Sequence, residues 1–245
     1  MQAQRILKFL SEIAHNNNRE WFYENKKEYD AVRKDFEADI EKAILKIAEF
    51  DPSVAHLSIK DVTYRFNRDT RFSPDKSPYK RHLGAYIAAH GKKSLHGGYY
   101  IHLEPGHCML CVGTYWLPTN ILTACRNEIM SRIDDWRKMV ENRRFVSLFG
   151  RPDDVAKAKK TDEEGGEYDM GLPKGFGIVH LKSAPAGFPR DYEHIQYLRM
   201  KDYCCWRHVD DSFFEQDNWL SEMARVMRVG KPMMDFINAV VDDYE

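Results

Sequence analysis

The stretch GGYYIHLEPGHCMLCVGTYW, residues 97–116, decides the fold class of this chain. Apolar and aromatic residues dominate both of its halves, and the Glu-Pro-Gly-His sequence between them is a turn signal in which Pro105 and Gly106 suit the two central positions. Short connections of this kind join antiparallel strands. Together with LGAYIAAH at 83–90, this pattern predicts an antiparallel β meander within residues 58–116.

The same period of two extends upstream of these runs. Val62, Tyr64 and Phe66 alternate with polar residues, as the two faces of a half-buried strand do. We therefore expect the first strand of the meander to lie at about 58–66. A further strand is expected in DYCCWRHV at 202–209, after a short helix in YEHIQYLRM at 192–200.

Helical spacing flanks the meander on both sides. Apolar residues at intervals of three or four predict an amphipathic helix at about 6–13 and a long helix at about 20–47, with Asn17 as its cap. A stripe from Ile121 to Val140 predicts another helix, with Thr119 as its cap. Two helices are expected at the end of the chain, separated near Gly230-Lys231-Pro232.

Length and composition limit the function classes. A chain of 245 residues suits one large domain, so we expect a single α+β domain over 1–245, with long amphipathic helices from both ends packed on the meander. The formal net charge is −1, so any face that binds nucleic acid must be local. We expect no membrane span and no secretion signal, and the five cysteines, an odd number, predict a reduced cytoplasmic setting.

One polar stretch interrupts this pattern. Residues 151–175, RPDDVAKAKKTDEEGGEYDMGLPKG, lose all apolar periodicity and contain four glycines. Such a composition predicts an exposed loop or an insertion.

The segment RFNRDTRFSPDKSPYKRH, residues 65–82, concentrates positive charge. Six of its residues are Arg or Lys and two are Asp, and its two prolines stiffen the backbone. Arginine offers a planar fork of donors to phosphate or carboxylate, and lysine adds a mobile charge. The sequence therefore predicts an anion site whose contacts are Arg65, Arg68, Arg71, Lys76 and Lys80.

Three interpretations of this segment stay open. The first is a site for an anionic, phosphate-bearing small molecule or nucleotide. In the second, the same cations contact nucleic-acid phosphates, and Tyr79 or Phe72 stacks on a base. In the third, the segment is an internal Arg–Asp network of a structural or partner-docking domain. The cofactor, the oligomeric state and any catalysed reaction stay undetermined.

Several segments together resemble one family. They are NNNREWF, YRFNRDTRFSPDKSPYK, GGYYIHLEPG, LKSAPAGFP and KPMMDF. They resemble successive motifs of the uncharacterised family catalogued as domain of unknown function 2461, known from bacteria and fungi. The resemblance implies an α+β domain and supplies no reaction, cofactor or substrate. This chain departs from it in Arg-Phe-Asn at 65–67, where the family more often has Arg-Ile-Tyr, and in the longer polar stretch 151–175.

Acid–base and metal chemistry have few candidates in this sequence. Tyr100, His102 and Glu104 share one strand face, and with Asp69 the last two are the candidate acid–base groups, although a solvent-exposed polar sheet face explains them more simply. Cys108 and Cys111 are three residues apart in a strand, so they point to opposite faces and predict core packing rather than zinc. Five histidines between residues 82 and 107 match no metal-binding spacing, so we expect no metal site.

Overall fold

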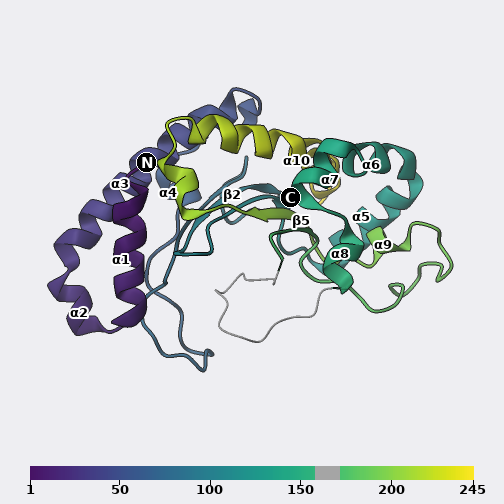
Figure 1. Ribbon diagram of the computed structural model, residues 1–245. Helices are drawn as coiled ribbons and strands as arrows, with labels where there is room; N and C mark the ends of the chain where they lie inside the picture. The colour runs from purple at the N-terminus through teal and green to yellow at the C-terminus, as the bar shows by residue number, and fades with distance from the viewer. Residues whose placement is uncertain (158–171) are drawn as a thin grey trace. The chain divides into compact units, whose positions relative to one another are not determined.

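The computed structural model describes residues 1–157 and 172–245, and the strands of this part form one open antiparallel sheet (Figure 1). The sheet has the order β1-β2-β3-β5-β4. Its strands are β1 (Leu83–Ile87), β2 (Gly98–Leu103), β3 (Met109–Thr114), β4 (Lys174–Phe176) and β5 (Tyr203–His208). β4 pairs antiparallel with β5, with Gly175 opposite Trp206. Helices precede and follow the sheet, which confirms the predicted α+β class.

The meander is confirmed, and its tightest turn is the one that the sequence marks. β1, β2 and β3 are neighbours both in the chain and in the sheet. The backbone N–H of His107 donates to the carbonyl of Glu104 at 2.9 Å, which closes a turn with Pro105 and Gly106 at its centre. Gly106 adopts a φ of +76°, the conformation that glycine allows at the third position of a type II turn.

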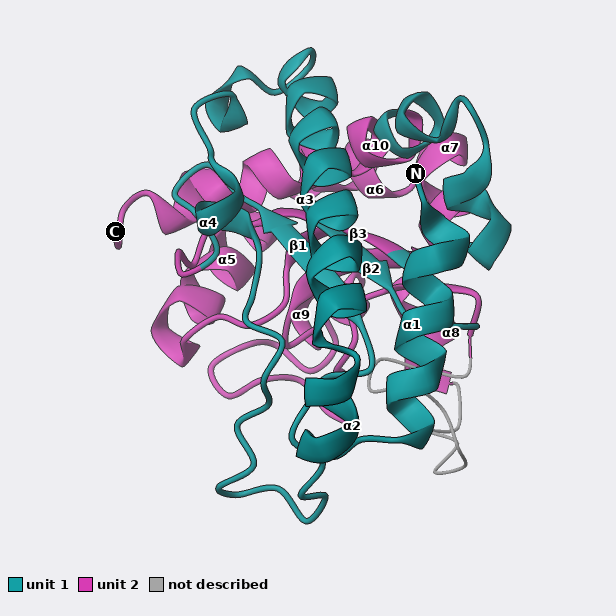
Figure 2. Cartoon of the chain, turned by 90° about the vertical axis from the view of Figure 1, so that its left-hand side faces the viewer, with its two compact units in different colours: residues 1–92, 100–109, 209–224 teal, residues 93–99, 110–208, 225–245 magenta. Residues whose placement is uncertain are grey.

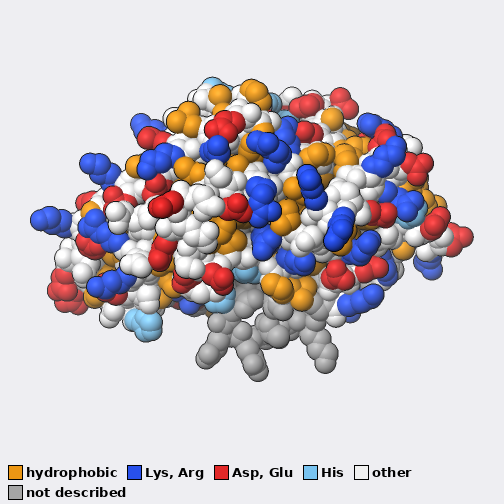
Figure 3. Space-filling model, turned by 45° about the horizontal axis from the view of Figure 1, so that its top comes forward, with side chains coloured by type: hydrophobic (Ala, Val, Ile, Leu, Met, Phe, Trp, Pro, Cys, Tyr) orange, Lys and Arg blue, Asp and Glu red, His pale blue; other side chains and the backbone are white. Residues whose placement is uncertain are grey.

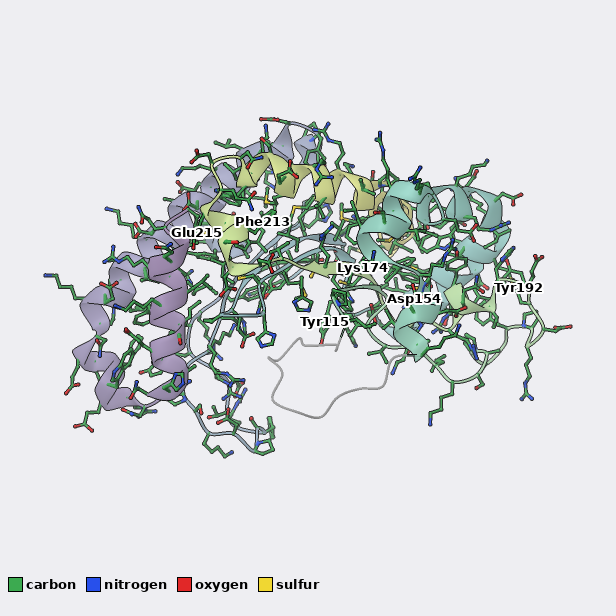
Figure 4. All side chains as sticks on the ribbon, in the orientation of Figure 1. Tyr115, Asp154, Lys174, Tyr192, Phe213 and Glu215 are labelled. Atoms are coloured by element: carbon green, nitrogen blue, oxygen red, sulfur yellow. The ribbon has the colours of Figure 1, made fainter. Side chains whose placement is uncertain are left out.

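The first part of the chain is helical. It contains α1 (Ala3–His15), α2 (Arg19–Glu24), α3 (Lys26–Ala48), the 3₁₀ helix η1 (Pro52–Val54) and α4 (Ile59–Val62). α1 and α3 lie side by side (Figures 1 and 2). Arg5 of α1 joins them through an ion pair with Glu28 of α3, with Nε and Oε1 2.7 Å apart. On another side of α1 lies the 3₁₀ helix η2 (Asp211–Glu215), whose Glu215, labelled in Figure 4, accepts a hydrogen bond from Gln4 at 3.0 Å.

The long helix expected at about 20–47 is two helices. Asn25 ends α2 and begins α3, and its side chain donates to the carbonyl of Trp21 at 2.9 Å. The N-cap of α2 is Asn18, whose side-chain oxygen accepts from the N–H of Trp21, and not Asn17 as expected. An Asn side chain that satisfies a backbone carbonyl competes with continued helix, which explains the break.

The prediction of a strand at 58–66 is wrong. Ile59–Val62 form the helix α4, which begins at a capping box in which the Asp61 carboxylate accepts from the N–H of Ser58 at 2.8 Å. Thr63 makes a bridge to Ala85 of β1. The alternation of apolar residues is too short to decide between the two structures, and the capping box favours the helix.

The helices of the second half are shorter than expected. They are α5 (Thr119–Ser131), α6 (Ile133–Val140), α7 (Arg143–Phe149), α8 (Pro152–Lys157) and α9 (Ile195–Leu198). The stripe expected at 121–140 is divided at Arg132, and Thr119 is the first helical residue because Pro118 occupies the N-cap. The short helix and the strand predicted at 192–209 are confirmed as α9 and β5.

The loop predicted at 151–175 contains regular structure at both of its ends. α8 occupies its first part, and β4 begins at Lys174, whose ammonium donates to the carbonyl of Ser147 at 2.6 Å. Figure 4 labels this lysine on its strand. The remainder of the expected loop, 158–171, lies outside the described residues.

The chain ends in one helix, α10 (Trp219–Val241), where two were expected. Pro232 lies inside it and cannot donate the hydrogen bond that its position requires. The helix continues through Pro232 because Met227 and Met233, on either side of the missing hydrogen bond, are fully buried. Gly230 lets the helix approach β3 closely, since a Cβ there would lie 2.9 Å from the Cβ of Val112.

The chain contains two compact units, coloured in Figure 2. Unit 1 comprises residues 1–92, 100–109 and 209–224, and unit 2 comprises 93–99, 110–208 and 225–245. The core of unit 1 contains the aromatic residues Phe9, Phe22, Tyr29, Phe66 and Tyr79. In unit 2, the ring of Trp136 lies 5.3 Å from Phe236 and 5.6 Å from Tyr203. The single-domain boundary 1–245 stays a prediction.

Candidate functional site

Residues 65–81, which we call the basic loop, form a hairpin-like excursion of unit 1. Its base is closed by two backbone hydrogen bonds, from Arg68 N–H to the Pro78 carbonyl at 2.9 Å and from Lys80 N–H to the Phe66 carbonyl at 3.0 Å. Asn67 and Tyr79 form a bridge between them. The charged tip, residues 69–77, is therefore held between two paired strands of backbone.

The base of the basic loop is anchored in the aromatic core. Tyr79 is 4% exposed and stacks on Phe22, with ring centroids 4.1 Å apart. Asn17 fixes the backbone of Tyr79 twice, accepting from its N–H at 3.0 Å and donating to its carbonyl at 2.9 Å. Asn17 is thus an anchor of the loop rather than a helix cap. Phe66 is buried in the same cluster.

Two of the loop's arginines are paired with its own carboxylates. Arg71 binds Asp69 with two hydrogen bonds, at 2.9 Å and 2.7 Å, which lower the pKa of that carboxyl to about 2. Arg68 is ion-paired with Asp75 and also donates to the carbonyl of Ser77 at 3.2 Å. Hydrogen bonds from the hydroxyl and N–H of Ser77, then from Arg68, lower the pKa of Asp75 to about 2. Both aspartates are therefore anionic at neutral pH.

The two arginines differ in exposure. The side chain of Arg68 is 27% exposed, whereas that of Arg71 is 76% exposed. Arg68 ties together three points of the loop, because it also reaches the hydroxyl of Ser73 at 3.4 Å. Arg71 contacts Asp69 through only one edge of its guanidinium and lies 5.8 Å from the ring of Phe72, which is 93% exposed. Arg68 is thus part of the loop framework, and Arg71 is accessible.

The remaining predicted contacts lie on the same excursion. Lys76 donates to the carbonyl of Thr70 at 2.9 Å, across the tip of the loop. The ammonium of Lys80 lies 5.1 Å from the ring of Tyr64, and Arg65 is exposed. Six cationic and two anionic side chains between residues 65 and 82 leave a local charge of +4 (6 − 2), with His82 neutral.

A second group of polar residues lies buried in unit 1. We call His82, His102 and Glu104, which are 6%, 0% and 5% exposed, the histidine cluster. Nε2 of His102 lies 3.1 Å from Oε2 of Glu104, and Nδ1 of the same ring lies 3.0 Å from the hydroxyl of Tyr100. The rings of His82 and His102 are 4.6 Å apart. The solvent-exposed polar face predicted for this strand is therefore wrong.

Burial and the neighbouring charges lower the pKa of His82. Burial, as the largest cause, and then electrostatic repulsion from His102, Lys80 and Arg81 together lower the pKa of its imidazole to about 2. His82 is therefore neutral at physiological pH. His82 lies between the basic loop and β1 in the chain. The histidine cluster therefore directly follows Lys80 and Arg81, the last cations of the basic loop.

The structure brings together two of the three predicted acid–base candidates. His102 and Glu104 are in contact, whereas Asp69 is at the tip of the basic loop and paired with Arg71. Sequence reasoning did not assign His82 to this group. One feature of the sequence could have indicated it. His82 directly precedes β1, the neighbour of the strand that carries the Tyr-x-His-x-Glu alternation.

The cysteines are buried, as predicted for core residues. Cys108 and Cys111 are 0% and 6% exposed, and both are free thiols. Burial raises the pKa of the Cys108 thiol to about 12, and its Sγ donates to the carbonyl of Glu104 at 3.5 Å. A thiol that stays protonated is a poor nucleophile and a poor metal ligand.

Residues 5–236 match the family described as Conserved hypothetical protein (DUF2461), and the chain belongs to that family, as its motifs indicated. The comparisons with curated proteins and with solved structures gave no match. Among the helices of the described residues, none has the length and apolar character that a bilayer crossing needs.

Proposed function

We propose that the basic loop binds an anionic, phosphate-bearing small molecule or nucleotide. The observation that supports this proposal is the local charge of +4 on a loop whose base is anchored by aromatic stacking and by Asn17, in a chain whose net charge is −1. An anchored loop loses little conformational entropy when it binds a ligand. Phosphate is the anion that several clustered Arg and Lys side chains suit best.

The predicted contacts have different roles in this proposal. Arg71, Lys76, Arg65 and Lys80 supply the charge that meets the ligand. Arg68 holds the loop in shape through Asp75 and Ser77, so its contribution to binding is chiefly the geometry of the tip. Asp69 orients the guanidinium of Arg71 and leaves its opposite edge for an oxygen of the ligand.

Nucleic acid is the second candidate, and one observation favours it. Phe72 is 93% exposed beside Arg71, as a ring that stacks on a base would be. Tyr79 is buried and stacked on Phe22, so the expectation that it stacks on a base is wrong. On the face drawn in Figure 3, cationic, anionic and uncharged side chains lie among one another. The small-molecule proposal comes first, because only one of the two rings expected to stack on a base is exposed.

The test is calorimetric titration of the purified chain with pyrophosphate, AMP, ATP and a single-stranded oligonucleotide at low and physiological salt. The variant Arg71→Gln/Lys76→Gln removes two accessible charges. The control is Lys8→Gln, since Lys8 is an exposed cation of α1, 77% exposed, outside the loop. Charge-assisted contacts contribute roughly 1.5–3 kcal/mol each, so the double variant should bind at least tenfold more weakly, and the control should bind normally.

Three results would decide against the proposal. The first is that wild type binds none of the phosphate compounds, and the second is that the double variant binds as tightly as wild type. Binding of the oligonucleotide alone, lost in Phe72→Ala, would favour the nucleic-acid candidate instead.

A further inference from the structure

We infer that His82, His102 and Glu104 form a binding site for one divalent transition-metal ion. This inference is independent of the anion site proposed for the basic loop. It also departs from the sequence-based expectation of no metal, because that expectation examined spacing along the chain and not neighbours across the sheet.

The sheet places three donor side chains together. His102 lies in β2 and Glu104 directly follows the strand, and the two side chains are in contact. His82 comes from the residue before β1, the neighbour of β2 in the sheet. The three side chains are buried together within unit 1, and no large movement of the backbone is needed to bring them into contact.

The distances between donor atoms suit a single ion. One donor atom from each of the three residues lies within 4.8 Å of the other two, and Nε2 of His102 is 3.1 Å from Oε2 of Glu104. Zinc-type ions sit about 2.1 Å from nitrogen and oxygen ligands, which places tetrahedral ligands about 3.4 Å apart. Nε2 of His102 and Oε2 of Glu104 lie slightly closer together than this, and all three donor atoms are near enough for side-chain rotation to bring them to the spacing that one ion needs.

A neighbouring side chain orients the central ligand. The hydroxyl of Tyr100 is 3.0 Å from Nδ1 of His102, which leaves Nε2 facing Glu104. Metal-binding histidines almost always have such a partner on the other ring nitrogen. Gly84 of β1 makes room for it, since a Cβ at this position would lie 2.4 Å from the Tyr100 hydroxyl. The glycine, the tyrosine and the histidine together form a supported ligand.

The donor set selects the class of ion. Two imidazoles and one carboxylate suit Zn²⁺, Fe²⁺ and Co²⁺, whereas Mg²⁺ and Ca²⁺ prefer oxygen ligands. Three protein ligands are the number found in catalytic zinc sites, where water or substrate completes the coordination. The competing explanation is a buried hydrogen-bonded network with no ion, and the two explanations predict different binding isotherms.

The experiment uses the full chain, stripped of metal with a chelator and titrated with Co²⁺, Zn²⁺ and Mg²⁺. Calorimetry measures affinity and stoichiometry, and the visible absorption of bound Co²⁺ reports its ligands. We expect one Co²⁺ per chain with visible bands that Zn²⁺ abolishes, and no binding of Mg²⁺. Retention of Co²⁺ binding by Arg71→Gln/Lys76→Gln separates this site from the anion site.

The variants are His82→Gln, Glu104→Gln and Tyr100→Phe, with His56→Gln as the control because His56 is an exposed histidine of the same unit. Loss of an outer partner costs 10–100-fold in metal affinity, so Tyr100→Phe should weaken binding about tenfold or more, and the two ligand variants should weaken it further. Circular dichroism checks that each variant is folded, and His82→Gln and Tyr100→Phe test the site should Glu104→Gln not fold.

The inference is overturned if folded wild type binds neither Co²⁺ nor Zn²⁺, or if it binds Mg²⁺ equally well. It is also overturned if His56→Gln lowers the affinity as much as His82→Gln does.

Discussion

Replacing Arg68 by alanine tests whether the charges of the basic loop form its framework. The side chain of Arg68 is 27% exposed and that of Asp75 is 58% exposed, so solvent screens their ion pair. Such a pair contributes about 0–1 kcal/mol to the free energy of unfolding. The hydrogen bonds of Arg68 to Ser77 and Ser73, at 3.2 Å and 3.4 Å, are long and together add about 1 kcal/mol.

The expected loss for Arg68→Ala is therefore about 1–2 kcal/mol. A fully buried ion pair would lose roughly 3–5 kcal/mol, and the exposure of both partners excludes that value here. For a chain of this size, 1 kcal/mol shifts the melting temperature by roughly 2–4 °C, so we expect a decrease of about 2–8 °C.

The assay is a thermal melt followed by circular dichroism, repeated in urea to obtain the free energy directly. Arg71→Ala is the matched control, because Arg71 is 76% exposed and its ion pair is with Asp69, two residues away in the same exposed tip. It should melt close to wild type. An equal decrease for both variants, or no change for Arg68→Ala, would refute the assignment of Arg68 as the framework residue.

Three further substitutions test other parts of the structure. Gly113→Ala should lower the free energy of unfolding by roughly 3 kcal/mol or more in urea melts, because φ is +115° and the new Cβ would lie 2.0 Å from the Tyr203 carbonyl oxygen; wild-type stability would contradict this. Asn17→Ala should cost about 1–3 kcal/mol and speed hydrogen exchange of the Tyr79 amide, which loses its acceptor; unchanged exchange would show that Asn17 is not the anchor. Burial raises the pKa of Asp202 to about 6, so between pH 4 and 6 the folded state holds a proton that the unfolded state has released. The free energy of unfolding of wild type, relative to that of Asp202→Asn, should therefore fall by up to about 3 kcal/mol as the pH rises from 4 to 6. A pH-independent difference would contradict that assignment.

Local patterns predicted the elements whose signals are strong over a short span. The Pro-Gly turn at 105–106 and the aromatic and aliphatic runs around it predicted β2 and β3, because a β-turn and strand alternation depend on neighbouring residues. The region 58–66 failed because it contains two local signals that conflict. Its alternation favours a strand, and its Ser58–Asp61 capping box favours a helix.

Helix boundaries depended on contacts that lie far away in the sequence. Pro232 predicts an end to the helix, yet α10 continues through it because residues on both sides are buried. Burial against other elements supplies more free energy than one lost hydrogen bond removes. No window of the sequence around Pro232 contains that information.

The two candidate sites divide in the same way. The basic loop is contiguous, so its charge, its prolines and its aromatic residues could be identified directly in residues 65–82. The different roles of Arg68 and Arg71 could not be predicted from the sequence, because they depend on the exposure of each side chain and on the groups that each guanidinium reaches.

By itself, then, the sequence determined the α+β class, the meander and the concentration of cations, since each follows from residues that are close in the chain. Only the tertiary structure placed His82 beside His102 and Glu104, twenty and more residues away, and buried all three. Pairing between strands sets which side chains become neighbours across a sheet, so residues that are far apart in the sequence can meet there, and the spacing of histidines along the chain does not show it.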